Sequence, residues 1–402
     1  MKTCRQSNAS EAVLAELIAH NLASLEKQID YNIRSRIGLF RISSDLIPFG
    51  SSPVNRIPWW EVFAKDLDRI GSKIRESGMR VSMHPGQYTV INSPDKGVVD
   101  RAAEDLLYHT RVLESLNLDR QHKIVLHVGG VYQDKEAAMS RFLDHFRALP
   151  ETVRGRLILE NDDRSYHTGD VLSLARRAEL PAVFDNLHDR VNPDPLGPHW
   201  TDVLRDFAAT WRKEDGPQKI HYSQQDPGRK PGSHSRSVAI DPFLDFIRCL
   251  PDPCVDVMLE VKDKNLSAVK CILCTQPAPK VRDLEEEWKR YKYKVMERSQ
   301  GAYDQIRVLF SGQNRPDPVA FYRLVENALR EEERSGGQVN AAQHVWGYFK
   351  KQATPGEQDR FFKLIKGVET GTVKGKALRK HLYGMTLRYG QSYLMESYYF
   401  YL

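Results

Sequence analysis

Residues 122–160 read HKIVLHVGGVYQDKEAAMSRFLDHFRALPETVRGRLILE. Two short apolar runs, 122–127 and 156–160, enclose a stretch at 135–149 whose apolar residues recur at helical spacing. Short apolar runs between loops are typical of strands buried in a parallel sheet, and parallel neighbours need a helical crossover between them. This segment therefore predicts one strand–helix–strand unit of an α/β protein.

The same alternation continues in both directions from this unit. Further strand-like runs occupy 36–43, 80–83, 181–185, 219–223 and 255–260, and helical patterns occupy 10–32, 60–76, 99–116, 171–178, 204–212 and 243–250. No glycine-rich nucleotide fingerprint opens the chain, and crossovers this regular favour a TIM-type (β/α) barrel over an open doubly wound sheet. Because only seven strands are found and an eighth would have to precede Ser10, we expect a barrel that lacks its first strand.

The character of the sequence changes after about residue 282. The stretch DLEEEWKRYKYKVMERSQ, residues 283–300, begins a helical region that continues to the end of the chain without a convincing strand. We therefore expect a barrel domain over residues 1–281 and an all-α accessory domain over residues 282–402.

Composition excludes several classes of protein. The net charge of +6 on 402 residues favours an anionic partner only weakly. No apolar run approaches the roughly 18 residues of a membrane helix, and the first residues lack the apolar core of a signal peptide. Five cysteines are too few and too scattered for a disulfide framework, and plain packing is favoured over redox or metal chemistry for the pair Cys271 and Cys274. We expect a cytoplasmic, monomeric protein with no membrane partner.

The strands after the first one all finish at or near a histidine or a carboxylate. These residues are His84, His127, Glu160, Asp185, His221 and Glu260, and His188 and His234 follow in the adjoining loops. In a TIM barrel the carboxyl ends of all strands meet at one rim. Residues far apart in sequence would therefore converge at one site, although each histidine taken alone is more often structural.

Imidazole and carboxylate groups gathered at such a rim suit Zn²⁺ or Mn²⁺. Eight of them exceed the needs of one ion, so two or three ions, bridged by a carboxylate such as Glu160, are predicted. Clustered metals of this kind promote phosphodiester hydrolysis. Lys219 faces the same way as His221. Beside metals it would have to be neutral or chemically modified, and a salt bridge to Asp185 or Glu260 is the structural alternative.

The loop that follows His84 reads HPGQYTVINSP, residues 84–94. Its Pro-Gly turn would hold Gln87 and Tyr88 over the rim. A tyrosine there can stack on a base or wedge into a duplex, and a glutamine can replace lost base hydrogen bonds. The alternative is a tyrosine packed against a neighbouring loop.

Seven motifs that span nearly all of residues 1–268 resemble the UV damage endonuclease family. They are FRISSDLIPFGSSP (40–53), HPGQYTVINSP (84–94), LHVGGVYQDK (126–135), LILENDDRSY (157–166), VFDNLHDRVNP (183–193), KIHYSQQDPGRKPGSHS (219–235) and DVMLEVKDK (256–264). The resemblance implies a TIM-barrel relative of endonuclease IV with a trinuclear, usually manganese, site. It also implies nicking of damaged double-stranded DNA 5′ to photoproducts and some other lesions, with a 3′-hydroxyl and a 5′-phosphate as products.

The resemblance also assigns residues, motif by motif. It implies the metal ligands His84, His127, Glu160, Asp185, His188, His221, His234 and Glu260, with zinc, cobalt or magnesium as alternatives to manganese. It implies catalytic roles for Glu160, Lys219, His221 and Glu260, and Lys219 matches a lysine that can be carboxylated. Gln87 and Tyr88 match a pair that probes damaged DNA, and Arg229 and Lys230 are expected to contact the DNA backbone.

One departure concerns the beginning of the chain. Members of the family begin with a strand that is not found here, so we expect either a start codon placed too far downstream or a barrel open between the strands at 36–43 and 255–260. If the missing strand ruins the site, the protein would bind damaged DNA without cutting it. A third hypothesis is a metal-dependent sugar isomerase or epimerase of the related barrel superfamily, which usually holds one ion.

The C-terminal region resembles a helical bacterial domain of unknown function. The motifs are YKYKVMERSQGAY (291–303), NAAQHVWGYFKK (340–351) and ALRKHLYG with YGQSYLMESYYF (377–400). Its basic and aromatic residues could bind nucleic acid, namely Lys292, His344, Tyr348, Lys350, Arg379 and Tyr393. Such residues on helices are more often surface and core, and both hypotheses stay open.

Overall fold

The computed structural model describes residues 1–312 and 315–402 and divides into two compact units. The first unit comprises Met1–Val238 and Phe243–Val269, and the second comprises Ala239–Pro242 and Lys270–Leu402. The domain boundary that we expect near Arg282 stays a prediction.

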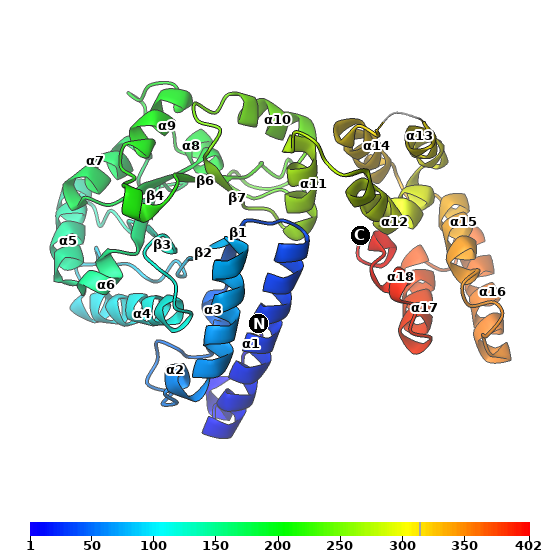
Figure 1. Ribbon diagram of the computed structural model, residues 1–402, viewed down its shortest axis with the longest axis horizontal. Coiled ribbons are helices and arrows are strands. Elements are labelled where there is room, and N and C mark those ends of the chain that lie inside the picture. Colours follow the sequence, from blue (N-terminus) through cyan, green and yellow to red (C-terminus); the bar gives the residue numbers. More distant parts are fainter. Residues whose placement is uncertain (313–314) are drawn as a thin grey trace. The chain divides into compact units, whose positions relative to one another are not determined.

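The first unit is a nearly closed barrel of seven parallel strands surrounded by helices (Figure 1). Each strand pairs with the next one in the chain. The strands are β1 (Leu39–Ile42), β2 (Arg80–Met83), β3 (Lys123–His127), β4 (Leu157–Glu160), β5 (Ala182–Asp185), β6 (Lys219–Tyr222) and β7 (Asp256–Leu259). The prediction of a TIM-type barrel with one strand missing is confirmed.

Polar side-chain contacts connect the two edges of this sheet. Within the described strands no ladder joins β1 to β7. Instead, the Arg41 guanidinium on β1 forms an ion pair with the carboxylate of Glu260, directly after β7. Further out, the Asn265 amide donates to the Tyr31 hydroxyl at 3.0 Å. Polar contacts thus connect the two edges where a strand pairing is absent.

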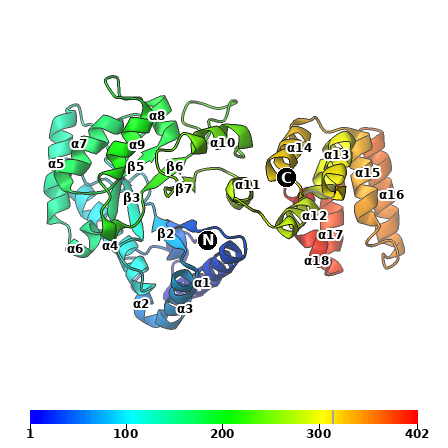
Figure 2. The ribbon, with the colours of Figure 1, turned by 45° about the horizontal axis from the view of Figure 1, so that its top comes forward.

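Helices cover the outside of the barrel. They are α1 (Glu11–Arg34), α2 (Trp59–Val62), α3 (Ala64–Ser77), α4 (Lys96–Ser115), α5 (Lys135–Ala148), α6 (Glu151–Arg154), α7 (Thr168–Ala178), α8 (Asn186–Val191), α9 (Trp200–Ala208), α10 (Ile240–Arg248) and α11 (Asn265–Thr275), with 3-10 turns at Gln6–Asn8, Ser44–Leu46 and Lys213–Asp215. The first helix begins where its capping residue predicts, because the Ser10 hydroxyl accepts from the backbone N–H of Val13. α1 and α3 lie side by side (Figure 2), joined by an ion pair between Arg69 and Glu26.

The prediction of one helix over residues 60–76 is wrong. The chain forms two helices, α2 and α3, that meet at Phe63, whose φ of −107° and ψ of 20° interrupt the helical backbone. The break directs α2 so that Trp59 packs edge-on against Tyr108 of α4, with ring centroids 6.1 Å apart. Tertiary packing therefore overrides a continuous helical pattern here.

The barrel interior is layered. Val125, Ile158 and Val183, on three adjacent strands, form a small buried cluster of their own, with Trp211 packed against it. This cluster is separate from the main core, which lies between the sheet and the surrounding helices. Since side chains alternate along a strand, the residues two positions later on these strands also point inward, at the carboxyl end.

Charged groups close the amino end of the barrel. The Arg80 guanidinium donates to the Asp256 carboxylate at 2.8 Å and to the Asp215 carbonyl at 2.7 Å. The buried Lys123 ammonium pairs with the Asp215 carboxylate and donates to the Gly155 carbonyl at 2.9 Å. Each buried charge at this end therefore has a partner, as burial requires.

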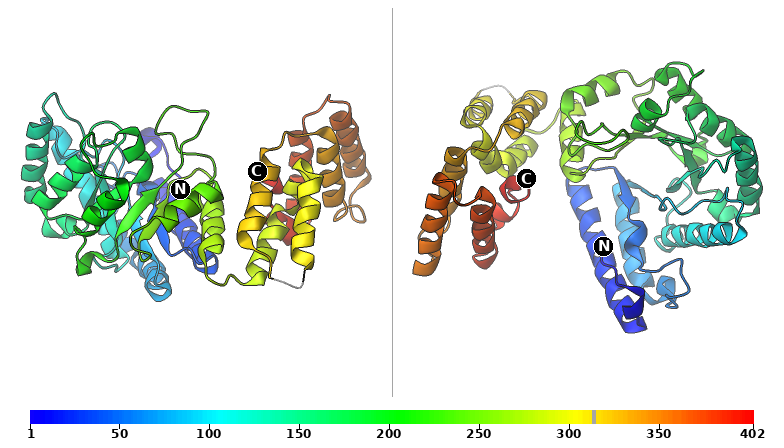
Figure 3. Two further views of the ribbon diagram at one scale, coloured as in Figure 1. Left: turned by 90° about the horizontal axis from the view of Figure 1, so that it is seen from above. Right: turned by 180° about the vertical axis from the view of Figure 1, so that it is seen from behind.

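The second unit consists of helices (Figure 3). They are α12 (Val281–Arg298), α13 (Gln300–Ser311), α14 (Pro318–Arg330), α15 (Ser335–Trp346), α16 (Pro355–Glu369), α17 (Gly375–Arg388) and α18 (Ser392–Met395), followed by a 3-10 turn at Tyr398–Phe400. Its core is rich in aromatic side chains, and Trp346 stacks on Phe361 with centroids 4.3 Å apart. Across the described parts of both units, no helix combines the length and the apolar character needed to cross a membrane.

Candidate metal centre

The carboxyl rim of the barrel gathers histidines and carboxylates from consecutive strands. Glu160 belongs to two groups whose possible ligand atoms all lie within 4.8 Å of one another. One group is His84, His127 and Glu160, and the other is Glu160, Asp185, His221 and Glu260. The residues that end the six strands β2 to β7 therefore converge in space, as the barrel topology predicts.

Glu160 lies at the centre of this cluster and is fully buried. Its Oε2 is 3.1 Å from Nε2 of His84 and 3.5 Å from Nε2 of His127, and its Oε1 contacts Nδ1 of His221. Burial alone would raise the pKa of this carboxyl group, but the neighbouring imidazoles of His221 and His127 lower the pKa well below its ordinary value. Glu160 is therefore an anion placed between three rings.

Backbone carbonyls orient two of the rings. Nδ1 of His84 lies 3.1 Å from the Pro85 carbonyl, and Nδ1 of His188 lies 2.8 Å from the Asn161 carbonyl. A carbonyl only accepts, so each Nδ1 donates, and in the neutral ring the lone pair is then on Nε2. Metal-binding histidines are oriented in this way in many proteins.

Asp185 is held rigidly at the end of β5. Its Oδ1 accepts from the backbone N–H groups of Leu187 and His188, each at 2.8 Å. The Asn161 side chain braces the same residue, since it accepts from the Asp185 N–H at 2.9 Å and donates to the Asp185 carbonyl at 3.1 Å. Burial raises the pKa of Asp185 to about 7. Sequence reasoning missed Asn161, although it directly follows Glu160.

His234 reaches the rim through a folded loop. The loop after β6 turns back on itself, and Gln225 pairs with His234 in an isolated antiparallel bridge. Nε2 of His234 then lies 3.6 Å from Oε2 of Glu260, whose Oε1 is 3.2 Å from Nδ1 of His221. His234, which follows His221 by 13 residues, thus contacts the same carboxylate, that of Glu260.

Arg41 is a rim residue that the sequence interpretation did not include. Its Nη2 contacts Glu260 and lies 3.2 Å from Nε2 of His221. The only sequence signal is its position, one residue before the end of β1 and paired in register with Ser82 of β2. The guanidinium supplies a positive charge beside a carboxylate that the resemblance assigns to metal binding.

Lys219 lies inside the barrel, two residues before His221, and is 1% exposed. Its ammonium has no hydrogen-bond partner among the described residues, so the salt bridge to Asp185 or Glu260 considered above is not formed. Burial lowers the pKa of Lys219 well below its ordinary value, and the positive charges of Arg41 and Arg80 lower it further. Both effects favour the neutral amine over the ammonium.

The cluster fits divalent metal ions on two observations. First, the oxygen and imidazole donors are those that Mn²⁺ and Zn²⁺ take from proteins. Second, the buried atoms Nδ1 of His127, Oδ2 of Asp185 and Nζ of Lys219 lack hydrogen-bond partners in the described parts of the chain. Buried polar atoms are normally satisfied, so unsatisfied atoms at one site indicate a missing ligand.

The loop after His84 presents its tip to solvent. The Thr89 N–H donates to the Gly86 carbonyl at 2.9 Å and closes a turn over Gln87 and Tyr88. The Thr89 hydroxyl donates to Asp105 of α4 at 2.6 Å and holds the turn in place. Tyr88 is 83% exposed, so the alternative of a tyrosine packed against a neighbouring loop is not what the structure has.

Arg229 and Lys230 lie at the exposed tip of the loop that carries His234. The Gln225 side chain supports this tip, since its amide donates to the Lys230 carbonyl at 3.0 Å and its Oε1 accepts from the Gly232 N–H at 2.9 Å. Gly232 has a φ of 80°, which favours glycine. The two cations therefore extend from a braced loop at the carboxyl end of the barrel, the end that carries the His/Asp/Glu cluster.

The candidate nucleic-acid residues of the second unit have different surroundings. Arg379 forms an ion pair with the buried Glu297, so its positive charge is balanced within the unit. Tyr348 stacks on Tyr393 with centroids 5.7 Å apart, and Lys292 lies over the Tyr293 ring. The nucleic-acid hypothesis for this unit stays a prediction.

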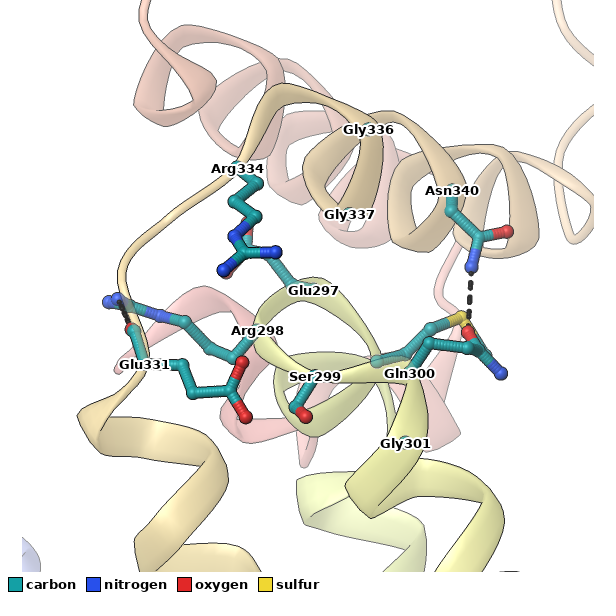
Figure 4. Close-up of a pocket in the computed structure, with 11 residues that line it drawn as sticks. Glu297, Arg298, Ser299, Gln300, Gly301, Glu331, Arg334, Gly336, Gly337 and Asn340 are labelled. Atoms are coloured by element: carbon teal, nitrogen blue, oxygen red, sulfur yellow. Dashed lines mark hydrogen bonds between the residues drawn. The ribbon is translucent and has the colours of Figure 1, made fainter.

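The second unit also contains a pocket of about 420 Å³ (Figure 4). It opens between the last turn of α12 and the first turns of α13 and α15, and its lining includes Ser299, Glu331 and Arg334. The Asn340 amide donates to the Gln300 side chain at 3.1 Å across one side. Its lining carries charges of both signs and none of the imidazole that marks the barrel rim.

Comparisons with known proteins give a family for each of the two parts of the chain. Residues 1–289 match the family described as UV-endonuclease UvdE, and residues 292–402 match a protein family of unknown function, DUF1722. The UV DNA damage endonuclease of Clostridium perfringens is 37% identical over 353 residues, which cover 87% of this chain and 84% of that protein.

Two further comparisons concern the barrel. The UV DNA damage endonuclease of Bacillus pumilus is 32% identical over 270 residues, which cover 66% of this chain and 83% of that protein. The crystal structure of SacUVDE superposes with a TM-score of 0.64 at 37% sequence identity and covers 67% of this chain and 91% of that one. Both matches span most of the relative's own length.

Proposed function

The chain belongs to the UV-endonuclease family, and we propose that its rim cluster is a centre of two or three divalent metal ions that cuts DNA 5′ to a lesion. Membership makes the protein a DNA repair endonuclease. The finer statements are our proposal: manganese as the metal, UV photoproducts and some other lesions as substrates, and a 3′-hydroxyl and a 5′-phosphate as products.

The observation that carries the proposal is the position of Glu160 among three imidazoles at the carboxyl rim. The residues that would hold the ions are those of the rim cluster, namely His84, His127, Glu160, Asp185, His188, His221, His234 and Glu260. A sugar isomerase is not favoured, because the relatives from Clostridium perfringens and Bacillus pumilus are named UV DNA damage endonuclease.

The chemistry divides between the ions and the chain. When bound, the ions would supply a hydroxide near neutral pH and stabilise the attacking and leaving oxygens. The chain's own residues keep the ligand atoms fixed: the Pro85 carbonyl orients His84, and the Leu187 N–H fixes the Asp185 carboxylate. Because these groups are positioned before substrate arrives, little reorganisation remains for the reaction itself.

Lys219 is proposed to carry a carboxyl group. A neutral amine reacts with carbon dioxide, forming a nitrogen–carbon bond and releasing one proton, and burial, which lowers the pKa of Lys219, favours that neutral form. The carbamate would be an anion in a position where the unmodified nitrogen has no partner among the described residues. It would therefore add a ligand where an ammonium would repel the ions.

Recognition of the lesion is assigned to the exposed loops. Tyr88 would stack in the space left by a displaced base, and Gln87 would replace the lost base hydrogen bonds. Arg229 and Lys230 would contact phosphates, which position DNA without reading its sequence.

Metal content and carbamate content test this proposal together. We expect two to three manganese ions per chain from elemental analysis, and a labelled carbamate signal after exposure to ¹³C-bicarbonate that the variant Lys219→Met lacks. One ion per chain would contradict the multinuclear centre. An unchanged carbamate signal in Lys219→Met would contradict the carboxylation of Lys219 and leave the multinuclear centre unaffected.

A further inference from the structure

Two apolar side chains extend into solvent from the same face of the barrel. Leu196 is 96% exposed and Tyr88 is 83% exposed, and they are the most exposed large apolar side chains in the part of the chain that the structure describes. The next, Val308, is 70% exposed and belongs to the second unit. At 96% exposure, Leu196 contributes almost nothing to the core of the folded chain, so its side chain is available for contact with a partner.

Leu196 lies in a loop at the carboxyl end of the barrel, the same end that carries the rim cluster. Its loop connects α8, which begins directly after β5, to α9. Asp194, two residues before Leu196, lies 3.6 Å from His167, the residue that caps α7 after β4. Since crossover helices run back along the barrel, the starts of α7 and α9 are both at the rim. Leu196 and Tyr88 thus extend from the loops after β5 and β2, with β3 and β4 between them.

The tip that carries Leu196 is built around Asp194. The Asp194 carboxylate accepts from the Leu196 N–H at 3.0 Å, and the Asp194 carbonyl accepts from the Gly197 N–H at 3.1 Å. The Asp194 carboxylate also lies close to the first turn of α7, since a Cβ at Gly169 would be 2.1 Å from its Oδ2. The leucine is therefore presented by a loop with defined contacts.

We propose that Leu196 is a second apolar probe, which inserts between base steps of the DNA while Tyr88 occupies the lesion. The proposal rests on the nuclease function above. Apolar wedges such as leucine unstack neighbouring bases and kink a duplex without reading sequence. Leucine has no hydrogen-bonding group, so it suits the opening of the helix rather than the identification of a base. Two probes on either side of the ligands from β3 and β4 would bend the duplex over the centre.

The test is single-turnover cutting of a photoproduct duplex by the manganese-loaded full chain. We expect Leu196→Ala to need about tenfold more enzyme for half-saturation, equal to about 1.4 kcal/mol, with little change in the maximal rate. Leu196→Met keeps an apolar side chain of similar size and should behave like the parent. Leu387→Ala is a matched control, because Leu387 is also exposed but lies on α17.

A second substrate separates a wedge from a general contact. In a duplex whose bases opposite the lesion are mismatched, the helix is already open, and Leu196→Ala should recover parent-like half-saturation. A 2-aminopurine beside the lesion should brighten on binding of the parent and less with Leu196→Ala. Equal half-saturation and equal brightening for parent and variant would overturn the inference. A parent that does not cut at all would overturn the proposed function instead.

Discussion

Replacement of Arg41 by alanine should destabilise the metal-free protein far more than the metal-loaded protein. Arg41 forms an ion pair with Glu260 between the two edges of the sheet, and its side chain is 29% exposed while that of Glu260 is 12% exposed. Loss of one partner costs about 3–5 kcal/mol in a buried pair and about 1 kcal/mol or less in an exposed pair. For a pair of this intermediate exposure we expect about 2 kcal/mol.

In a unit of this size that loss corresponds to a decrease of about 4–8 °C in the unfolding midpoint. Bound manganese would give the Glu260 carboxylate a new positive partner, so the decrease should shrink in its presence. Thermal unfolding with chelator and with Mn²⁺ measures both values. Arg69→Ala, which breaks the exposed pair with Glu26, is the control and should change neither value appreciably. The reasoning is refuted if Arg41→Ala loses the same stability in both conditions.

Two further predictions concern charge at buried sites. Glu160→Gln should abolish cutting while lesion binding survives, because the amide cannot replace a buried anion between three imidazoles. A cutting assay and a gel-shift assay measure the two effects. If the variant also lost binding, Glu160 would be needed for the fold rather than for the reaction. His122 accepts from the Val81 N–H at 3.0 Å, and burial lowers its pKa from 6.5 to about 4. Because the unfolded chain binds this proton first, the stability it contributes is complete above pH 6.5 and lost towards pH 4. The loss is about 3 kcal/mol. Urea unfolding of the parent and of His122→Asn, which keeps an acceptor, should therefore differ in acid sensitivity, and identical pH profiles would disprove the assignment.

Local pattern was sufficient for most of the barrel. Each strand after β1 is a short run between loops, and a histidine or carboxylate at its end or one residue away marks the rim, as in LILE ending at Glu160. The barrel topology then converts these strand ends into neighbours. This is why residues as far apart as His84 and Glu260 were predicted to share one site.

Contacts across the barrel were not predictable in the same way. Arg41 looks like an ordinary surface charge within a strand, and only closure of the sheet brings it to Glu260, more than 200 residues later. The pairs Arg80–Asp256 and Lys123–Asp215 at the amino end have the same origin. The break at Phe63 also follows from packing, since nothing in the local spacing of apolar residues indicates it.

The most direct test of the account is cutting of a labelled duplex that carries one defined photoproduct. Purified protein with Mn²⁺ should cut the damaged strand immediately 5′ to the lesion, leave a 3′-hydroxyl, and lose this activity when a chelator is added. Intact DNA of the same sequence should remain uncut. A folded, manganese-loaded protein that leaves the damaged strand intact would contradict the account.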